Sequence, residues 1–172
     1  MPRAKTLTAT AADHRADAWL ALDKQLCFAL YSASHAMTKM YKPLLAPLGL
    51  TYPQYLVMLS LWEEDGQTVS ALGDKLALDS GTLTPLLKRL QAQGAITRER
   101  DTADERRVIV RLTDAGRELK IQARRIPPEV ARSSGCDLDQ VIRLMHELAT
   151  LRDSLIRATS PDPDADSGPS PH

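Results

Sequence analysis

Apolar residues recur every three or four positions over most of this chain, a spacing typical of amphipathic helices. The first such stretch predicts a helix over about residues 16–41. Its apolar stripe consists of Leu22, Leu26, Leu30, Ala33 and Met37. Pro43 and the "APLG" that follows it are expected to end this helix.

Thr51 is expected to begin the next helix. In "TYPQ" a threonine stands at the cap, a proline in the first turn and a glutamine three residues after the cap, as in a capping box. Leu56, Leu59 and Trp62 are predicted to face inward, and "EEDG" is expected to stop the helix.

Two shorter helices are predicted next, in "TVSALGDKLAL" and in "DSGTLTPLLKRLQAQG". Their expected buried positions are Val69, Leu72 and Leu76 in the first, and Leu83, Leu86, Leu87 and Leu90 in the second. Pro85 has no backbone N–H and fits best near a first turn, so the second of these helices is expected to begin near residues 80–82. Gly94 is a typical C-terminal stop.

After Gly94 the period changes to that of strands. "AITRERD" and "RRVIVRL" alternate apolar and polar residues about the polar turn "TADE", which predicts a β-hairpin. Thr113 is expected to cap a helix that runs to about Ile126 and is broken by Pro127 and Pro128, and a last helix is predicted over about residues 138–157. The N-terminus, residues 1–15, and the Pro-, Asp- and Ser-rich tail, residues 159–172, are expected to be flexible or disordered.

This order of elements predicts a mainly α protein with a small β-hairpin wing. Two short helices followed by a hairpin form a winged helix-turn-helix, expected over about residues 51–113, whose second helix enters the DNA major groove. The residues expected to contact DNA are Ser80, Thr82, Thr84 and Lys88 on that helix and Arg98, Arg106 and Arg107 on the hairpin. Residues 86–111 carry seven Lys or Arg against four Asp or Glu, a net charge of +3 that favours a phosphate-facing surface. The alternative is an ordinary solvated hairpin with local ion pairs.

Composition narrows the classes of protein. The 172 residues fit one domain or one domain with an appendage. The 22 basic residues balance 22 acidic ones, so the overall charge indicates no polyanion partner. The N-terminus has no apolar signal region, and no apolar run is long enough to span a membrane, so we expect a cytoplasmic location. The two cysteines lack zinc-site spacing, and neither a metal nor a cofactor is expected.

Cys27 lies on the first predicted helix, with Tyr31 one turn further on. Tyr41 lies on the same helix face, but fourteen residues at about 1.5 Å each place it about 21 Å along the axis. Tyr41 therefore cannot contact Cys27 of its own chain while the helix is straight. One alternative is that the cysteine is an inert, packed apolar residue and that the tyrosines pack at an interface. The spacing along the helix does not decide between this alternative and a reactive thiol.

The stretch "LDSGTLTPLLKRLQAQGAITRERD", followed by "DERRVIVRLTDAG", resembles the MarR family of bacterial winged-helix regulators over roughly residues 20–155. "LDSGTLTPLLKRL" is similar to the organic hydroperoxide-sensing branch, the OhrR type. The resemblance implies a MarR-like domain over residues 16–158 and an obligate homodimer on a pseudo-palindromic operator. The helices that join the dimer would be those over about residues 16–41 and 114–157. It also implies that Arg106 enters the minor groove and that Asp104 holds the wing in shape.

In that branch a reactive cysteine on the first helix is held by tyrosines, and the matching positions here are Cys27, Tyr31, Tyr41 and Tyr52. The resemblance implies that Tyr41 and Tyr52 come from the other subunit. Cys136 of the other subunit is the expected resolving thiol, which would trap the oxidised Cys27 as a disulfide.

The predicted function is a redox-sensing repressor that binds its double-stranded operator when reduced and releases it when organic hydroperoxide oxidises Cys27. One alternative is a MarR-type regulator switched by an aromatic or other small ligand, with both cysteines incidental. A thiol peroxidase is a further alternative, but a recognition helix and wing have no use in such an enzyme, so no enzymatic activity is expected.

Overall fold

The computed structural model of the protein describes residues 19–159, which fall into two compact units that meet at residues 126 and 127. The flexible segments expected at residues 1–15 and 159–172 lie outside the described residues, apart from Thr159, which still belongs to the last helix.

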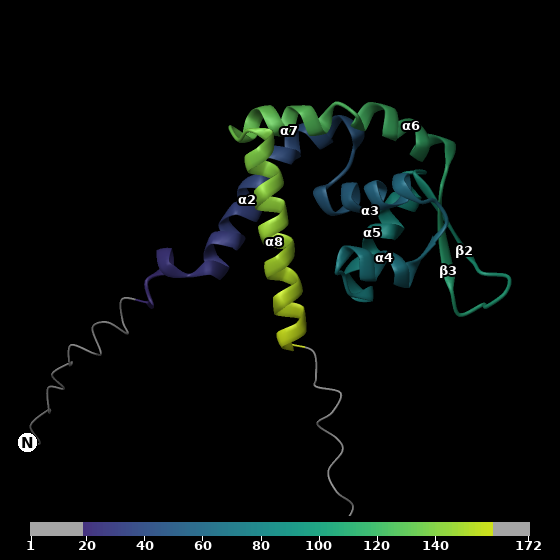
Figure 1. Ribbon diagram of the computed structural model, residues 1–172. Coiled ribbons are helices and arrows are strands. Elements are labelled where there is room, and N and C mark those ends of the chain that lie inside the picture. Colours follow the sequence, from purple (N-terminus) through teal and green to yellow (C-terminus); the bar gives the residue numbers. More distant parts are fainter. Residues whose placement is uncertain (1–18, 160–172) are drawn as a thin grey trace, which may run out of the picture. The chain divides into compact units, whose positions relative to one another are not determined.

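The first unit consists of helices and a small antiparallel sheet (Figure 1). Its elements are η1 (Leu22–Lys24), α2 (Leu26–Leu45), η2 (Ala46–Leu48), α3 (Tyr52–Glu63), β1 (Gln67–Thr68), α4 (Val69–Leu76), α5 (Ser80–Ala92), β2 (Ile96–Arg100), β3 (Val108–Leu112) and α6 (Asp114–Ala123). The order α4, α5, β2, β3 is that of a winged helix-turn-helix. The predicted fold class, mainly α with a small wing, is confirmed.

Local side-chain bonds determine where most of these helices begin. Gln54 Oε1 accepts a hydrogen bond of 2.8 Å from the backbone N–H of Thr51, so the predicted capping box forms at α3. Thr68 and Thr113 cap α4 and α6 through their hydroxyls. Gly94 adopts φ 73° just beyond α5, a left-handed conformation that suits glycine, and the predicted stop is confirmed.

The predicted bounds of the first helix are wrong at both ends. The helix begins at Leu26, because residues 22–24 form a 3-10 turn and Gln25 is extended. At the other end Pro43 lies inside the last turn, and the helix continues to Leu45. Leu45 is buried, so its packing holds this turn in place although Pro43 removes one backbone hydrogen bond.

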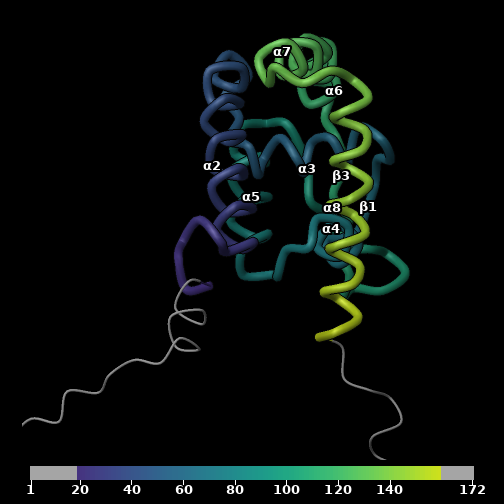
Figure 2. The backbone as a smooth tube through the Cα atoms, turned by 60° about the vertical axis from the view of Figure 1, so that its left-hand side comes forward, coloured from purple at the N-terminus to yellow at the C-terminus, as the bar shows by residue number. Residues whose placement is uncertain are grey.

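Helix α3 is the centre of the first unit. It packs against α2, α4, α5, α6 and β3, and both views show it among them (Figures 1 and 2). Trp62 is buried as predicted, but Leu56 and Leu59 are only half-buried. Val57, Met58 and Leu61 form the buried side instead. A helix enclosed on most sides has no single apolar stripe, so periodicity selected the wrong leucines.

The shorter helices bury fewer of the predicted side chains than expected. Leu72, Leu83, Leu87 and Leu90 are buried, whereas Val69, Leu76 and Leu86 are half-buried. Helix α5 begins at Ser80, as predicted, with Pro85 inside it.

The predicted hairpin is confirmed, but its strands are shorter and its connection is longer than the sequence predicted. Strands β2 and β3 pair from Ile96 with Leu112 to Arg100 with Val108, and residues 101–107 form the connection. Gln67 and Thr68 add strand β1 to the other edge of β3, in the order β1-β3-β2. A two-residue strand is too short to alternate visibly, so the sequence did not reveal it.

The second unit contains the rest of α7 (Ile126–Ser134) and α8 (Leu138–Thr159). The predicted break at Pro127 and Pro128 is wrong, because both prolines lie in the first turn of α7, where backbone N–H groups have no helical partner. Helix α8 leaves α7 at a sharp angle (Figure 1) and has no buried residue. The last predicted helix is confirmed.

Candidate DNA interface and thiol site

The N-terminal turn of α5 is organised by Asp79. Its carboxylate accepts the backbone N–H of Thr82 at 2.9 Å and the hydroxyl of Thr82 at 2.8 Å. These bonds, the hydroxyl bond first, lower the pKa of Asp79 below its ordinary value. Since the Thr82 hydroxyl proton is engaged, this side chain can offer DNA only an acceptor. Ser80 and Lys88 are exposed on α5.

A concave surface, which we call the wing groove, lies between α4, α5 and the wing. It measures about 350 Å³ and is lined by Thr68, Val69, Ser70, Thr84, Leu87, Arg98, Arg106, Arg107 and Val108. The groove thus brings together four residues predicted from separate segments: Thr84 and the three arginines. Ser80, Thr82 and Lys88 are not part of its lining.

Sequence reasoning missed two polar residues of the wing groove, Thr68 and Ser70. Their hydroxyl oxygens lie 3.1 Å apart at the start of α4, where Thr68 also accepts the backbone N–H of Ala71. A threonine before an apolar helical pattern is the cap signal that could have identified this site.

At the wing tip, Asp104 binds Arg106. Asp104 Oδ1 accepts both the backbone N–H and the Nε–H of Arg106 at 3.1 Å, and the Asp104 carbonyl accepts the N–H of Arg107 at 2.8 Å. The bond from the Arg106 side chain is the main cause that lowers the pKa of Asp104. The Arg106 side chain is 92% exposed. This geometry folds the tip and leaves a guanidinium at its outer surface.

Cys27 is the second residue of α2, and its thiol is exposed. Tyr31 lies one turn further on, and its ring centroid is 4.4 Å from that of His35. Tyr41 and Tyr52 lie near the other end of α2, with ring centroids 4.8 Å apart. The structure therefore brings Tyr41 and Tyr52 together but does not place them at Cys27 of the same chain.

The phenols near the end of α2 are held in their neutral form. Burial first, and then neighbouring Tyr52 and Tyr55, raise the pKa of Tyr41 above its ordinary value. Burial and Tyr52 likewise raise the pKa of Tyr55. A neutral phenol keeps its proton and can donate it in a hydrogen bond.

Cys136 belongs to the second unit, in the connection between α7 and α8 after Gly135. Its thiol is exposed, and Sγ lies 3.7 Å from the carbonyl oxygen of Ser134. The predicted position in a polar joint between helices is confirmed.

Large apolar side chains are exposed on the first and last helices. On η1 and α2 these are Leu22, Leu26, Phe28, Leu30 and Met37, and on α8 they are Leu138, Ile142, Leu144, Met145, Leu148, Leu155 and Ile156. Amphipathic helices of this kind are stable in water when another apolar surface covers them.

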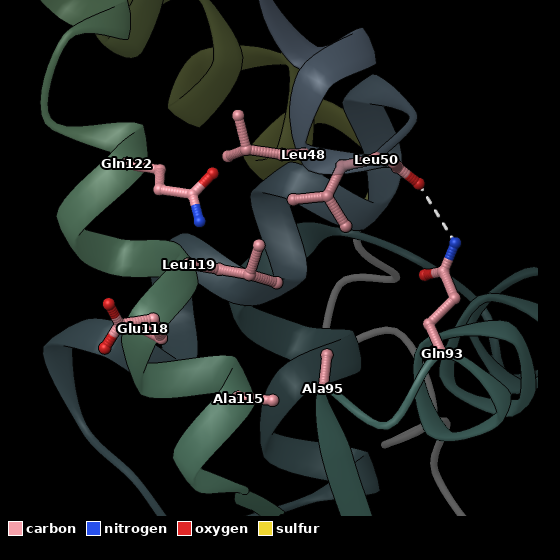
Figure 3. A pocket seen from close by; sticks show the side chains of 9 residues that line it. Leu48, Leu50, Gln93, Ala95, Ala115, Glu118, Leu119 and Gln122 are labelled. Carbon is pink, nitrogen blue, oxygen red and sulfur yellow. Dashed lines mark hydrogen bonds between the residues drawn. The ribbon is translucent and has the colours of Figure 1, made fainter.

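A separate cleft of about 360 Å³ lies between η2, the end of α5 and α6 (Figure 3). Leu48, Leu50 and Leu119 point into it, and Gln93 Nε2 donates to the Gly49 carbonyl at 3.0 Å. None of the residues predicted to bind DNA or to carry thiol chemistry lines this cleft.

Within residues 19–159, no cluster of three or more His, Cys, Asp or Glu could hold a metal ion. No single helix in that range is long and apolar enough to cross a membrane. The bent pair Leu26–Leu48 and Tyr52–Glu63, with 68° between its parts, meets that criterion by length and composition only.

Comparison with known proteins identifies the family. Residues 39–123 match the transcriptional regulator SarA/Rot family. The chain is 51% identical over 130 residues to the organic hydroperoxide resistance transcriptional regulator of Bacillus subtilis (strain 168), covering 74% of this chain and 88% of that protein. The chain belongs to the MarR/SarA-type family of winged-helix transcriptional regulators.

Two further family members are similar over most of the chain. The regulator TtmR of Methylorubrum extorquens (strain PA1) is 54% identical over 134 residues, 78% of this chain and 69% of TtmR. AbfR of Staphylococcus epidermidis, solved in its reduced form bound to DNA, is 37% identical with a TM-score of 0.67, covering 83% of this chain and 99% of AbfR. The predicted family resemblance is confirmed, and the protein is a DNA-binding transcriptional regulator.

Proposed function

We propose that this regulator is a thiol-based repressor. As a reduced homodimer it binds a pseudo-palindromic operator, and it releases the operator when an organic hydroperoxide oxidises Cys27. Cys136 of the partner subunit resolves the oxidised thiol as a disulfide.

The observation that carries this proposal is the separation of thiol and phenols along α2. Cys27 is exposed at one end of α2, and the pair Tyr41 and Tyr52 packs near the other end, about 21 Å along the axis. If two α2 helices pair in antiparallel fashion, each Cys27 meets Tyr41 and Tyr52 of the partner subunit. Phenols that donate to sulfur favour the thiolate, which is the form that attacks peroxides.

The exposed apolar side chains support such a dimer. Each buried Leu or Ile contributes about 1.5–3 kcal/mol relative to exposure, so covering Leu26, Leu30 and Met37 on both copies would hold two α2 helices firmly. Helix α8 has a comparable exposed apolar surface and no buried residue of its own, so it also needs a covering partner.

The chemistry uses one equivalent of hydroperoxide per switching event. The Cys27 thiolate attacks the terminal peroxide oxygen, the O–O bond breaks, and the alkoxide leaves and takes up a proton as an alcohol. The resulting sulfenic acid is attacked by the Cys136 thiol of the partner subunit; the S–O bond breaks and water leaves with the thiol proton. Two thiols have then lost two electrons, which reduced the peroxide.

In the reduced state, α5 and the wing groove would dock on DNA. Arg106 and Arg107 supply positive charge at the wing tip, and Thr84 and Lys88 lie on α5. AbfR, which has been solved bound to DNA in its reduced form, supports this assignment of the reduced state.

The test follows operator binding and free thiols in one titration with cumene hydroperoxide. Wild-type protein should release DNA as it loses thiols and should migrate as a covalent dimer without reductant. Cys27→Ser should bind DNA and keep it. Release of DNA by oxidised Cys27→Ser, with the wild-type dependence on peroxide, would place the sensor elsewhere.

A second candidate function, regulation by a small ligand, is favoured by one specific groove. This groove of about 430 Å³ lies between α2 and the start of α3 and is lined by His35, Thr38, Lys39, Lys42, Ala46, Leu50, Thr51, Tyr52 and Pro53. Its two lysines and its apolar lining residues suit an amphipathic organic anion. Release of operator by an aromatic carboxylate such as benzoate, with thiols intact, would favour this function.

A further inference from the structure

The last residue of β3 is held by two charged side chains that lie outside the wing. The backbone N–H of Leu112 donates to Asp65 Oδ1 at 2.8 Å, and its carbonyl accepts from Arg117 Nη1 at 3.0 Å. Asp65 and Arg117 are themselves paired, with Arg117 Nη2 and Asp65 Oδ2 2.9 Å apart. Both backbone groups of Leu112 are therefore bound by one ion pair, which we call the wing clasp.

The wing clasp joins three segments that are far apart in sequence. Asp65 lies in the connection between α3 and β1, Leu112 ends the wing, and Arg117 lies in the first turns of α6. Asp65 Oδ1 also accepts the N–H of Gly66 at 2.8 Å, which fixes the carboxylate in its own turn. The next residue of the chain is bound as well, since Thr113 N donates to the Ala95 carbonyl at 3.1 Å.

The wing can change its direction only at its root, because its two strands are bonded to each other along their length. The root of β3 is held at two places: β1 pairs with Ile109 and Val110, and the wing clasp binds Leu112. A change of backbone angle at Leu112 would move the distant tip far more than the root. The wing clasp fixes both hydrogen-bonding groups of this hinge residue. Charge-assisted bonds of this kind are stronger than neutral ones.

We propose that Asp65 and Arg117 are positioning residues for DNA binding: they act through Leu112 to aim the wing, without contacting DNA themselves. The proposal rests on the proposed docking of the wing on DNA. Asp65 and Arg117 change DNA affinity by placing Arg106 at the wing tip.

The sign of the change in DNA affinity distinguishes this proposal from ordinary electrostatics. Asp65 is an acid on a unit that binds a polyanion, so removing its charge alone should strengthen DNA binding. The wing clasp predicts the opposite. Glu63 provides a matched control, because it is an exposed carboxylate two residues away that pairs with Lys75 at 2.8 Å and takes no part in the clasp.

The experiment measures affinity for a duplex selected from a random pool by the reduced wild-type protein. Asp65→Ala should bind about tenfold more weakly, and Glu63→Ala equally or more tightly than wild type. In a double-mutant cycle, Asp65→Ala should add little to Arg106→Ala, because a wing without its arginine gains nothing from being aimed. Asp65→Asn and Arg117→Lys, which keep part of the bonding, should give intermediate losses with native circular dichroism, so the test does not depend on Asp65→Ala folding.

Three outcomes overturn the proposal. If Asp65→Ala binds as tightly as Glu63→Ala while Arg106→Ala is weakened, the wing docks but the clasp does not aim it. If the losses of Asp65→Ala and Arg106→Ala add in full, Asp65 acts independently of the wing. Unchanged affinity of Arg106→Ala would instead remove the proposed wing docking, and the clasp proposal with it.

Discussion

Arg106→Ala should separate DNA affinity from protein stability. The Arg106 side chain is 92% exposed, and its partner within the described residues is Asp104, in a surface pair at 3.1 Å. A fully exposed surface pair of this kind adds little to stability, so the midpoint of urea unfolding should stay close to that of the wild type. A lost groove contact of an arginine is worth about 1–3 kcal/mol, and the proposed homodimer would lose two, so operator affinity should fall at least about thirtyfold.

The salt dependence gives a second magnitude. Each phosphate-facing cation contributes about 0.9 to the slope of log affinity against log salt, so losing two should lower the slope by about 1.8. Fluorescence anisotropy at several salt concentrations measures both quantities on one labelled duplex. Arg124→Ala, an exposed arginine beyond the end of α6, is the charge-matched control and should change the affinity far less. A loss below threefold for Arg106→Ala, or an equal loss for Arg124→Ala, would refute the docking of the wing.

Three further predictions concern the thiol site and the fold. Tyr41→Phe should slow oxidation of Cys27 by hydroperoxide roughly tenfold, because the hydrogen bond from the phenol to the charged sulfur is lost. Tyr55→Phe, which removes a hydroxyl from a buried side chain, should leave the oxidation rate unchanged. Stopped-flow thiol titration measures both rates. Because burial raises the pKa of Tyr41, the unfolded chain loses the phenol proton at lower pH than the folded protein does. The free energy of unfolding should therefore be constant below about pH 10 and fall as the pH rises through the pKa of folded Tyr41. Tyr41→Phe should reduce that fall, as measured by urea titrations at alkaline pH. Gly116→Ala should destabilise the fold by about 2–3 kcal/mol, because the new Cβ would lie 2.0 Å from the Ala95 carbonyl oxygen. Gly94→Ala should destabilise it by about 1 kcal/mol, because a Cβ there meets open space but the backbone has φ +73°. If urea unfolding shows the reverse order of the two losses, the packing argument is wrong.

Much of the fold was readable because the signals are local. The capping pattern at Thr51, the stop at Gly94 and the cap at Thr113 each depend on side chains within a few residues, so the sequence predicts these boundaries well. The alternation after Gly94 predicts the hairpin for the same reason. The helix pair and basic hairpin thereby identified the class of protein and the surface proposed to contact DNA.

The errors share a different cause. Pro127 and Pro128 predicted a break because proline interrupts the interior of a helix. In the structure both prolines lie in the first turn of α7, and the break lies at residues 124–125. Only the structure decides between a break at the prolines and a break before them. The choice of Leu56 and Leu59 failed because α3 is enclosed by four other helices and a strand, so its burial depends on its neighbours rather than on its own period. Strand β1 forms because Gln67 and Thr68 pair with the edge of β3, which lies far away in the sequence.

The candidate sites divide in the same way. The sequence by itself determined the residue types and their spacing along α2, α5 and the wing, because spacing on a regular element is geometry. Only the tertiary structure decided that Thr68 and Ser70 share a groove with Arg106, that Tyr41 packs on Tyr52, and that Asp65 binds Leu112 across 47 positions. Those contacts join segments whose distance in the chain carries no information about their distance in space. They form because burying the apolar faces of α3, α4 and α5 brings the connections between them together.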